Sequence, residues 1–285
     1  MKTLQKTAIS AVAVALLAGL STLAFAADEP AAEVEVSPIT ANVTVVNDYR
    51  YRGISQSNFK PAIQGGFDYA HESGLYIGNW NSSISWISDS FPSTGGTRVT
   101  APVEMDFYGG IKKELIGEGF ASDLGVLQYY YPTSGLNVSG TVANPNTTEI
   151  YAAQNFTFGP LTGFVKLSYS LSPIFGFANS SGSYYPDLTM NYDTGVWGLA
   201  INAHVGYQYV AGNVQSSVPN QTNSSLYSYT DWKLGVTKDF GGGLSLSAAY
   251  VATDAKKTAG VYSYPSPTGK NLGGATGIVA LTKTF

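Results

Sequence analysis

The sequence contains no cysteine, and only 12% of its 285 residues are charged. Without cysteine the chain has no disulfide, no thiolate metal ligand and no lipid-modified cysteine behind a signal peptide. Lysine and arginine (15) are fewer than aspartate and glutamate (19), and no basic patch suits nucleic acid. These absences exclude a lipoprotein, a disulfide scaffold and a nucleic-acid-binding protein.

Long apolar runs are also absent after the first 26 residues. A membrane-spanning helix needs about 18 or more consecutive apolar residues, so the rest of the chain has no helical span. The chain is instead rich in glycine (32), tyrosine (20) and aromatic residues overall (13%). This composition favours strands that alternate between apolar and polar residues.

The N-terminus has the pattern of a secretory signal peptide. Lys2 and Lys6 form a basic region, residues 8–23 an apolar region, and Ala26 and Ala27 flank a small-residue cleavage site. An uncleaved anchoring helix is the alternative, but polar residues and a glycine interrupt the apolar region. We therefore expect a signal peptide over residues 1–26 and, after cleavage, a periplasmic N-terminal tail over residues 27–38.

From Ile39 onward the residues alternate, which is typical of strands with one apolar and one polar face. In the first segment, Ile39, Ala41, Val43, Val45, Tyr49 and Tyr51 share one face, opposite Thr40, Asn42, Thr44, Asp48, Arg50 and Arg52. Similar alternation occurs near residues 63–70, 104–115, 161–171, 199–209, 229–237 and 244–250. Residues 74–88, 120–131, 147–158 and 185–193 resemble strands without a clear inward face, and 274–285 closes the series. The total is twelve strands.

Short and long connections alternate between these segments. Tight joints are expected at residues 71–74, 116–119, 158–160, 193–198 and 239–243, and long polar stretches at 89–102, 132–146, 172–183, 211–225 and 254–273. Short periplasmic turns opposite long external loops are typical of outer-membrane barrels. We predict an all-β fold over residues 39–285, a transmembrane antiparallel up-and-down β-barrel of twelve strands.

The polar faces carry the charged residues that we expect to line the pore. These candidates are Asp48, Arg50, Arg52, Asp68, Glu104, Asp106, Lys112, Glu114, Lys166, Asp231 and Lys233. One interpretation is an ion-pair lattice that braces a wet lumen, and another is a selectivity region. The sequence alone leaves both open.

A catalytic or metal site is not expected. His71 falls in a predicted periplasmic turn, and His204 lies on an inward face without a serine or carboxylate at recognisable spacing. Nucleophilic triads and histidine metal sites need such partners. We therefore predict no catalytic residue, no metal ligand, no cofactor and no enzymatic activity.

Several motifs resemble one family of bacterial proteins. The segment 47–57, Asn-Asp-Tyr-Arg-Tyr-Arg-Gly-Ile-Ser-Gln-Ser, and residues 60–69 resemble the start of the TorF family of porins, a Gcw_chp-type family of bacterial outer-membrane proteins. The likeness continues at residues 129–132, 230–235 and 281–285, and so spans nearly the whole mature chain. It implies an outer-membrane location and a porin function.

The last strand ends on Phe285, with Leu281 and Val279 on the same face. This ending resembles the C-terminal signal that the outer-membrane assembly machinery recognises. Lys283 lies on that face as well, and we expect its side chain to extend toward the periplasmic interface.

Together these features predict a narrow channel in the bacterial outer membrane for passive diffusion of small polar solutes or ions. A structural or adhesive barrel with a plugged lumen and exposed polar loops is the alternative, and a barrel enzyme is a remote third. The expected partners are outer-membrane lipid and lipopolysaccharide, the assembly machinery and small solutes. The sequence leaves the oligomeric state open.

The signal peptide gives a prediction about the mature chain. Cleavage between Ala26 and Ala27 removes two lysines and changes the formal net charge from −4 to −6. Intact-mass measurement of protein from purified outer membranes should therefore find a chain that starts at Ala27. A chain that retains Met1 would contradict the prediction.

Overall fold

The computed structural model describes residues 37–91, 93–94, 96–138, 143–214 and 221–285. The expected signal peptide, its Ala26 and Ala27 boundary and nearly all of the expected tail lie outside these residues. No helix within the described ranges is long and apolar enough to span a membrane.

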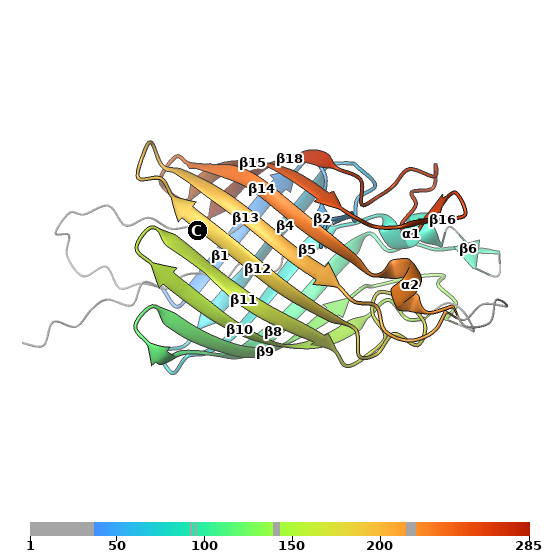
Figure 1. The fold of residues 1–285 in the computed structure, drawn as a ribbon, viewed down its shortest axis with the longest axis horizontal. Helices are drawn as coiled ribbons and strands as arrows, with labels where there is room; N and C mark the ends of the chain where they lie inside the picture. Colours follow the sequence, from blue (N-terminus) through green and yellow to red (C-terminus); the bar gives the residue numbers. More distant parts are fainter. Residues whose placement is uncertain (1–36, 92, 95, 139–142, 215–220) are drawn as a thin grey trace, which may run out of the picture.

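Twelve antiparallel strands form a closed barrel, as predicted (Figure 1). Its strands are β1 (Ile39–Val46), β4 (Ala62–Ala70), β5 (Leu75–Ser83), β8 (Val103–Gly117), β9 (Phe120–Tyr130), β10 (Thr147–Phe158), β11 (Leu161–Ser170), β12 (Tyr184–Asp193), β13 (Leu199–Gln208), β14 (Tyr229–Asp239), β15 (Leu244–Thr253) and β18 (Thr276–Thr284). Each strand pairs with its neighbours along the chain, and β1 pairs with β18 to close the sheet.

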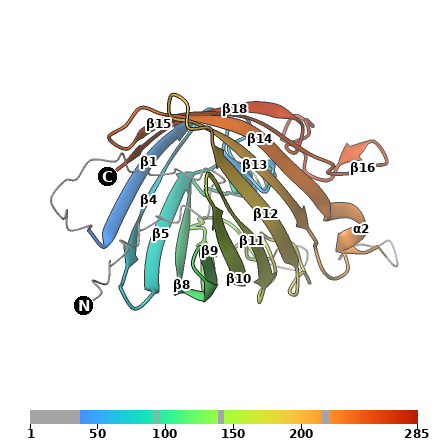
Figure 2. The ribbon, with the colours of Figure 1, turned by 60° about the vertical axis from the view of Figure 1, so that its left-hand side comes forward.

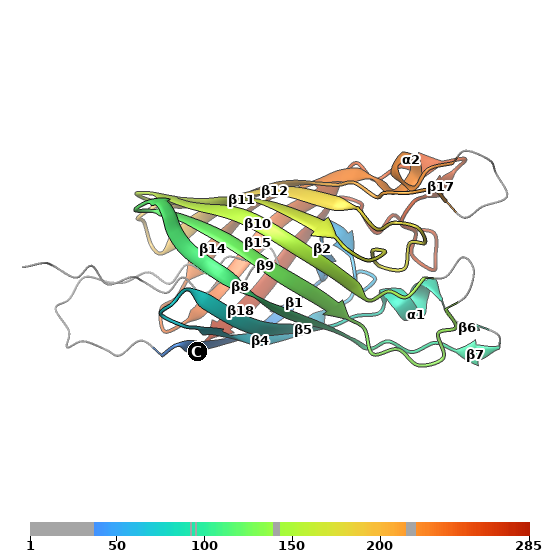
Figure 3. The ribbon, with the colours of Figure 1, turned by 90° about the horizontal axis from the view of Figure 1, so that it is seen from below.

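The two ends of the barrel differ in the length of their connections (Figure 3). The turn end has the short connections, residues 71–74, 118–119, 159–160, 194–198 and 240–243. The loop end has the long ones, and these contain β2 (Arg50–Tyr51), β3 (Ile54–Ser55), α1 (Trp86–Ser90), β6 (Ser93–Thr94), β7 (Thr97–Arg98), α2 (Asn223–Tyr227), β16 (Lys257–Thr258) and β17 (Val261–Tyr262). Phe285 lies at the turn end (Figure 2).

Neighbouring residues on each strand differ sharply in exposure. Val45 is 52% exposed, whereas Thr44 is 6% exposed and its hydroxyl lies 2.8 Å from that of Thr282 on β18. The large exposed side chains on the barrel strands are mostly apolar, and the buried ones include many carboxylates, amides and hydroxyls. The barrel therefore has an apolar exterior and a polar interior, as in outer-membrane barrels.

Contacts at the C-terminus complete the closure. Phe285 and Ala41 exchange two backbone hydrogen bonds, with N–O distances of 2.8 and 3.3 Å. Lys283 points outward on β18, and its Nζ donates to the carbonyl of Gly242 in the last short turn while lying 5.4 Å from the Phe285 ring centroid. Its charge is thus held at the turn end of the barrel.

The facing of the strands predicts how introduced charges act. Val45→Arg and Leu167→Arg place a cation on the apolar exterior, where a cation near the bilayer midplane costs about 2 to 4 kcal/mol. Both should reduce the yield of barrel with heat-modifiable gel mobility.

Asn202→Arg is the matched control, because Asn202 faces inward and is only partly buried. We expect this variant to assemble nearly as well as the parent. Equal loss of assembly in all three variants would contradict the assigned facing.

Candidate functional site

The first long loop, residues 47–61, folds into the barrel. The alternation of the sequence predicted that the first strand reaches Arg52, with Asp48, Arg50 and Arg52 on its inner face. That prediction is wrong, because β1 ends at Val46. Tyr49, predicted to face outward, is instead 2% exposed and packs edge-on against Trp80, with 5.5 Å between ring centroids.

Residues 50–55 form a small hairpin, which we call the inserted hairpin. Arg50 pairs with Ser55 and Tyr51 with Ile54. Its two turn residues have positive φ angles, 45° at Arg52 and 76° at Gly53, and paired positive φ angles define the tight turn that suits a two-residue hairpin. The sequence Arg-Gly thus supplies the turn.

The tip of the inserted hairpin contacts the inner wall at β15 and β14, two and three strands from β1 in the barrel. A Cβ atom added to Gly53 would lie 2.4 Å from Cγ2 of Thr253 on β15 and 2.8 Å from Cβ of Asp231 on β14. Because β18 lies between β1 and β15, the hairpin must extend inward past β18 to reach these strands. Only glycine fits both the backbone angle and the space at the tip.

Arg52 ties the hairpin to two further strands. Its Nη2 donates to Oε2 of Glu149 on β10 (2.7 Å), and its Nη1 donates to Oε1 of Gln208 on β13 (2.6 Å). The guanidinium also lies over the ring of Tyr185, 4.2 Å from its centroid. Burial lowers the pKa of Arg52, but Glu149, Tyr51 and Tyr129 together raise it by more, and the pKa stands well above its usual value. Arg52 is therefore a permanent cation.

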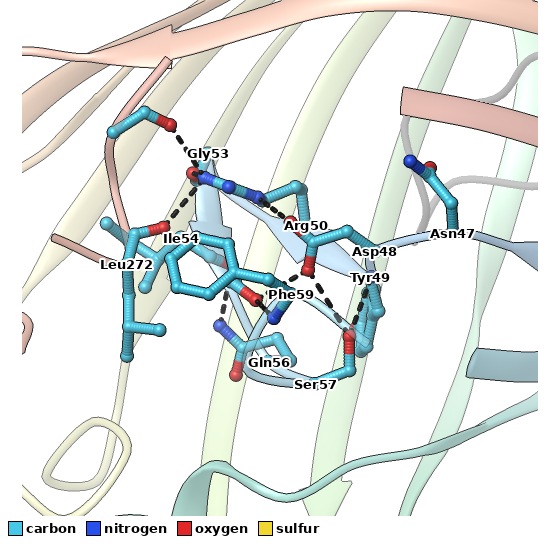
Figure 4. A network of polar contacts seen from close by, with 12 residues as sticks. Asn47, Asp48, Tyr49, Arg50, Gly53, Ile54, Gln56, Ser57, Phe59 and Leu272 are labelled. Atoms are coloured by element: carbon cyan, nitrogen blue, oxygen red, sulfur yellow. Dashed lines mark hydrogen bonds and ion pairs between the residues drawn. The ribbon is translucent and has the colours of Figure 1, made fainter. Parts of the chain in front are cut away.

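Arg50 holds the base of the hairpin (Figure 4). Its Nε donates to Oδ2 of Asp48 (2.6 Å), and its Nη1 donates to the carbonyls of Gly53, Leu272 and Gly274 (2.9, 2.7 and 3.1 Å). Ser55 donates to the other oxygen of Asp48 (2.5 Å). These contacts join the first long loop to the last.

Seven of the remaining predicted pore-lining residues lie on inward faces of barrel strands. They are Asp68 on β4, Glu104, Asp106 and Lys112 on β8, Lys166 on β11, and Asp231 and Lys233 on β14. Glu114 differs, because it is exposed near the turn end of β8 and accepts a hydrogen bond from the Gly119 N–H (3.0 Å). Glu114 therefore fastens a short turn at the rim.

Tyrosine hydroxyls donate hydrogen bonds to two of the inward carboxylates. Tyr76 donates to Asp123 (2.6 Å) and Tyr108 donates to Asp68, while the hydroxyls of Tyr76 and Tyr151 are hydrogen-bonded to each other. We call these three tyrosines and their two aspartate partners the tyrosine wall, which extends over β4, β5, β8, β9 and β10.

Inward glycines make room for these rings. A Cβ atom at Gly78 would lie 2.5 Å from the ring of Tyr108, and one at Gly125 would lie 2.4 Å from the ring of Tyr151. Each ring therefore lies flat over a glycine of the adjacent strand. This arrangement keeps the rings close to the barrel wall.

The opposite wall brings two carboxylates to His204. Its Nδ1 lies 3.0 Å from Oδ1 of Asp187 on β12, and its Nε2 lies 2.8 Å from Oδ1 of Asp231 on β14. Tyr185 donates to the other oxygen of Asp231 (2.8 Å). The sequence offered no such partners, because adjacent strands place these residues together although they are far apart in the chain.

Sequence reasoning missed Asp123, Glu149 and Asp187. On β12 the alternation of polar and apolar residues was present, because Asp187, Thr189 and Asn191 alternate with apolar residues. Tyr185 obscured this pattern, since it is an aromatic residue on the same inward face. On β10 the inward Tyr151 and Ala153 concealed the same pattern around Glu149. Within the described residues, no three His, Asp or Glu side chains gather as a metal site, and this interior chemistry is one of charge and hydrogen bonding.

A closed antiparallel barrel with an apolar exterior and a polar interior is the fold of outer-membrane β-barrels, which include the porins. The chain belongs to the Gcw_chp family, described as a bacterial protein of unknown function, whose family model matches residues 27–285. The Gcw_chp part of the expected resemblance is thus confirmed, and the TorF name stays a prediction. No curated protein sequence matches the chain.

Similar solved structures are porins of low sequence identity. The NanC porin has 7% identity and a TM-score of 0.50, over 87% of this chain and 98% of that chain. The KdgM porin has 7% identity and a TM-score of 0.48 over the same shares, and Pseudomonas aeruginosa OprD has 12% identity and 0.41, over 88% and 67%. The likeness to NanC lies in the fold.

The contact at the hairpin tip predicts the effect of Gly53→Ala. The added Cβ collides with Thr253 and Asp231, so the hairpin should leave the interior while the barrel remains closed. Arg52 has a 6% exposed side chain in the parent, and we expect trypsin to cut after it only in the variant.

Gly241→Ala is the control, because Gly241 has a similar φ of 79° but no atom within 4 Å of an added Cβ. Mass spectrometry of the tryptic fragments identifies the cut. Protection of Arg52 in both variants would mean that the tip does not depend on this contact.

Proposed function

We propose that this protein is an outer-membrane channel for passive diffusion of small polar solutes or ions, with a conductance that the inserted hairpin limits. The apolar exterior and the shared porin fold support the location, with the short turns in the periplasm and the long loops outside. Lipid and lipopolysaccharide then surround the barrel, and the strand ending at Phe285 addresses it to the assembly machinery. The proposal includes no enzymatic activity.

The width of the barrel supports a narrow passage. Barrels of about 8 strands have an interior filled by side chains, and those of about 16 to 18 leave an open aqueous channel. A barrel of twelve strands lies between these limits. A passage of this width suits single small solutes rather than bulk diffusion.

The observation that carries the proposal is the position of the inserted hairpin inside the barrel, in contact with β10, β13, β14 and β15. Around the inserted hairpin, at the loop-end half, inward side chains such as Thr147, Glu149 and Ser170 are almost fully buried. Toward the turn end the burial is mixed, because Lys112 and Asn202 are partly buried and their register partners Asp123 and Asn191 are buried. The hairpin thus narrows the loop-end half of the interior.

The same observation favours a second candidate function. If the hairpin never leaves the outer half, the barrel is plugged, and its polar loops give it a structural or adhesive role. Single-channel conductance distinguishes the two candidates, because a channel conducts ions and a plugged barrel does not.

The interior charge favours cations. Asp123, Glu149 and Asp187 add to the inward acids expected from the sequence, so inward acids outnumber inward lysines and arginines. Charges act over about 8 Å at physiological salt, which is comparable to the half-width expected of so narrow a passage. The lumen should therefore prefer cations over anions.

Removing both hairpin arginines tests this function. In Arg50→Gln/Arg52→Gln, Asp48 and Glu149 lose their cationic partners and the hairpin loses its ties to β10 and to Leu272. We expect higher single-channel conductance in planar bilayers. In a salt gradient, the reversal potential should shift toward the Nernst potential of the cation.

Lys283→Gln is the matched control, because it removes a cation from the turn end outside the lumen. An unchanged reversal potential in the double variant would mean that the arginines only brace the loop. Absence of conductance in both parent and double variant would support the plugged barrel.

A further inference from the structure

Glu104 and Asp106 form an acid pair on the inner face of β8, at the loop-end half of the barrel. Each is 1% exposed, and the two carboxyl groups are close enough to interact electrostatically. Tyr49 donates to Oε1 of Glu104 (3.3 Å). The Tyr131 hydroxyl also lies near Glu104, but Oε2 of Glu104 and both oxygens of Asp106 have no hydrogen-bond partner of good geometry in the described chain.

Other inward carboxylates in the described ranges have a donor close by. The pairs are Asp48 with Arg50 (2.6 Å), Glu149 with Arg52 (2.7 Å), Asp187 with His204 (3.0 Å), Asp231 with His204 (2.8 Å), Asp123 with Tyr76 (2.6 Å) and Asp68 with Tyr108. No lysine or arginine of the described chain forms an ion pair with the acid pair. Arg50, Arg52 and His204 are paired with other carboxylates instead.

Two carboxyl groups in this position need either a bound proton or a cation to offset their charge. Burying a carboxylate without a partner is strongly unfavourable, and a second carboxylate beside it adds repulsion. The Glu149 carboxylate adds further negative potential at Asp106. A cation between the two groups would relieve both costs.

The donor atoms at the acid pair define the kind of cation. Carboxylate and tyrosine hydroxyl oxygens are hard ligands, which favour alkali and alkaline-earth ions over softer metals. Two carboxylates are few for a resident metal ion. They suit an ion that binds and leaves again, as conduction requires.

We propose that Glu104 and Asp106 form a cation-binding station in the lumen, so that the permeating solutes are small inorganic cations. The proposal rests on the channel function for permeation, but not for binding. Tyr49 belongs to the loop that carries the inserted hairpin and contacts Glu104, so the station lies where the hairpin meets the wall. Ca²⁺ binds two carboxylates more tightly than K⁺ does, and it should therefore slow the passage of K⁺.

Binding is tested first, without any current, on the detergent-refolded full-length protein. Tb³⁺ is the probe, because tyrosine excitation sensitises its luminescence and Tyr49 lies beside the acid pair. The parent should show sensitised emission that Ca²⁺ suppresses. Glu104→Gln/Asp106→Asn should weaken the apparent Tb³⁺ affinity by about tenfold or more, which is about 1.4 kcal/mol or more.

Asp68→Asn is the matched control, since it removes an inward carboxylate that already has a tyrosine donor. Equal Tb³⁺ affinity in the parent and the double variant would overturn the station. A second measurement needs no variant, because Ca²⁺ should raise the temperature at which the parent loses its folded gel mobility relative to a chelator. An identical temperature in Ca²⁺ and in the chelator would also count against the station.

Permeation is tested by adding Ca²⁺ to K⁺ currents in planar bilayers. Ca²⁺ should reduce the parent current, and Glu104→Gln/Asp106→Asn should abolish this block and lower the cation preference. A parent that binds Tb³⁺ through the acid pair but never conducts would overturn the channel function and keep the binding station. A conducting parent whose Ca²⁺ response is the same in the double variant would overturn the station and keep the channel.

Discussion

Closure of the sheet is the constraint on which the rest of the structure depends. Water is absent from the hydrocarbon core of a membrane, so a spanning sheet can leave no unpaired edge. The pairing of β1 with β18, with Val45 opposite Leu281, and the bonds between Ala41 and Phe285 remove that edge. Once the sheet is closed, alternate residues of each strand face opposite environments, and this separates the apolar exterior from the polar interior.

Closure also creates the interior that the first long loop occupies. The inserted hairpin brings two arginines into a space with little water, where each needs a buried anionic partner. Asp48 and Glu149 provide these partners, and loss of one member of such a buried pair costs about 3 to 5 kcal/mol. The same burial that fixes the hairpin leaves Glu104 and Asp106 without a protein cation. In the proposed channel, the constriction and the cation preference would thus both follow from the burial of the first loop.

Most of the barrel could be predicted from the sequence, because the two faces impose a period of two. The strand Thr147–Phe158 was predicted with the bounds that the structure shows. The inserted hairpin could not be predicted, since Asp48, Tyr49, Arg50 and Tyr51 continue the alternation of β1 and a local pattern does not reveal where a strand leaves the sheet. The only local signals were Gly53 and Pro61.

The contacts between strands were beyond sequence reasoning for a different reason. Alternation assigns a face but not a register, so it did not place Asp187 and Asp231 on either side of His204. It also did not show which carboxylates have donors, because Tyr108 reaches Asp68 across β5. The partners of a charge therefore required the three-dimensional arrangement.

The central claim, that the first loop is buried inside the barrel, is tested most directly by thiol labelling. The chain has no cysteine, so a single introduced thiol is the only target. Ile54→Cys places it on the inserted hairpin, where Ile54 is buried with Tyr229 and Leu272, and Thr97→Cys places it on an exposed loop. A membrane-impermeant maleimide added to intact cells should label Thr97→Cys readily and leave Ile54→Cys unlabelled until the barrel is unfolded. Equal labelling of both cysteines on intact cells would contradict the account.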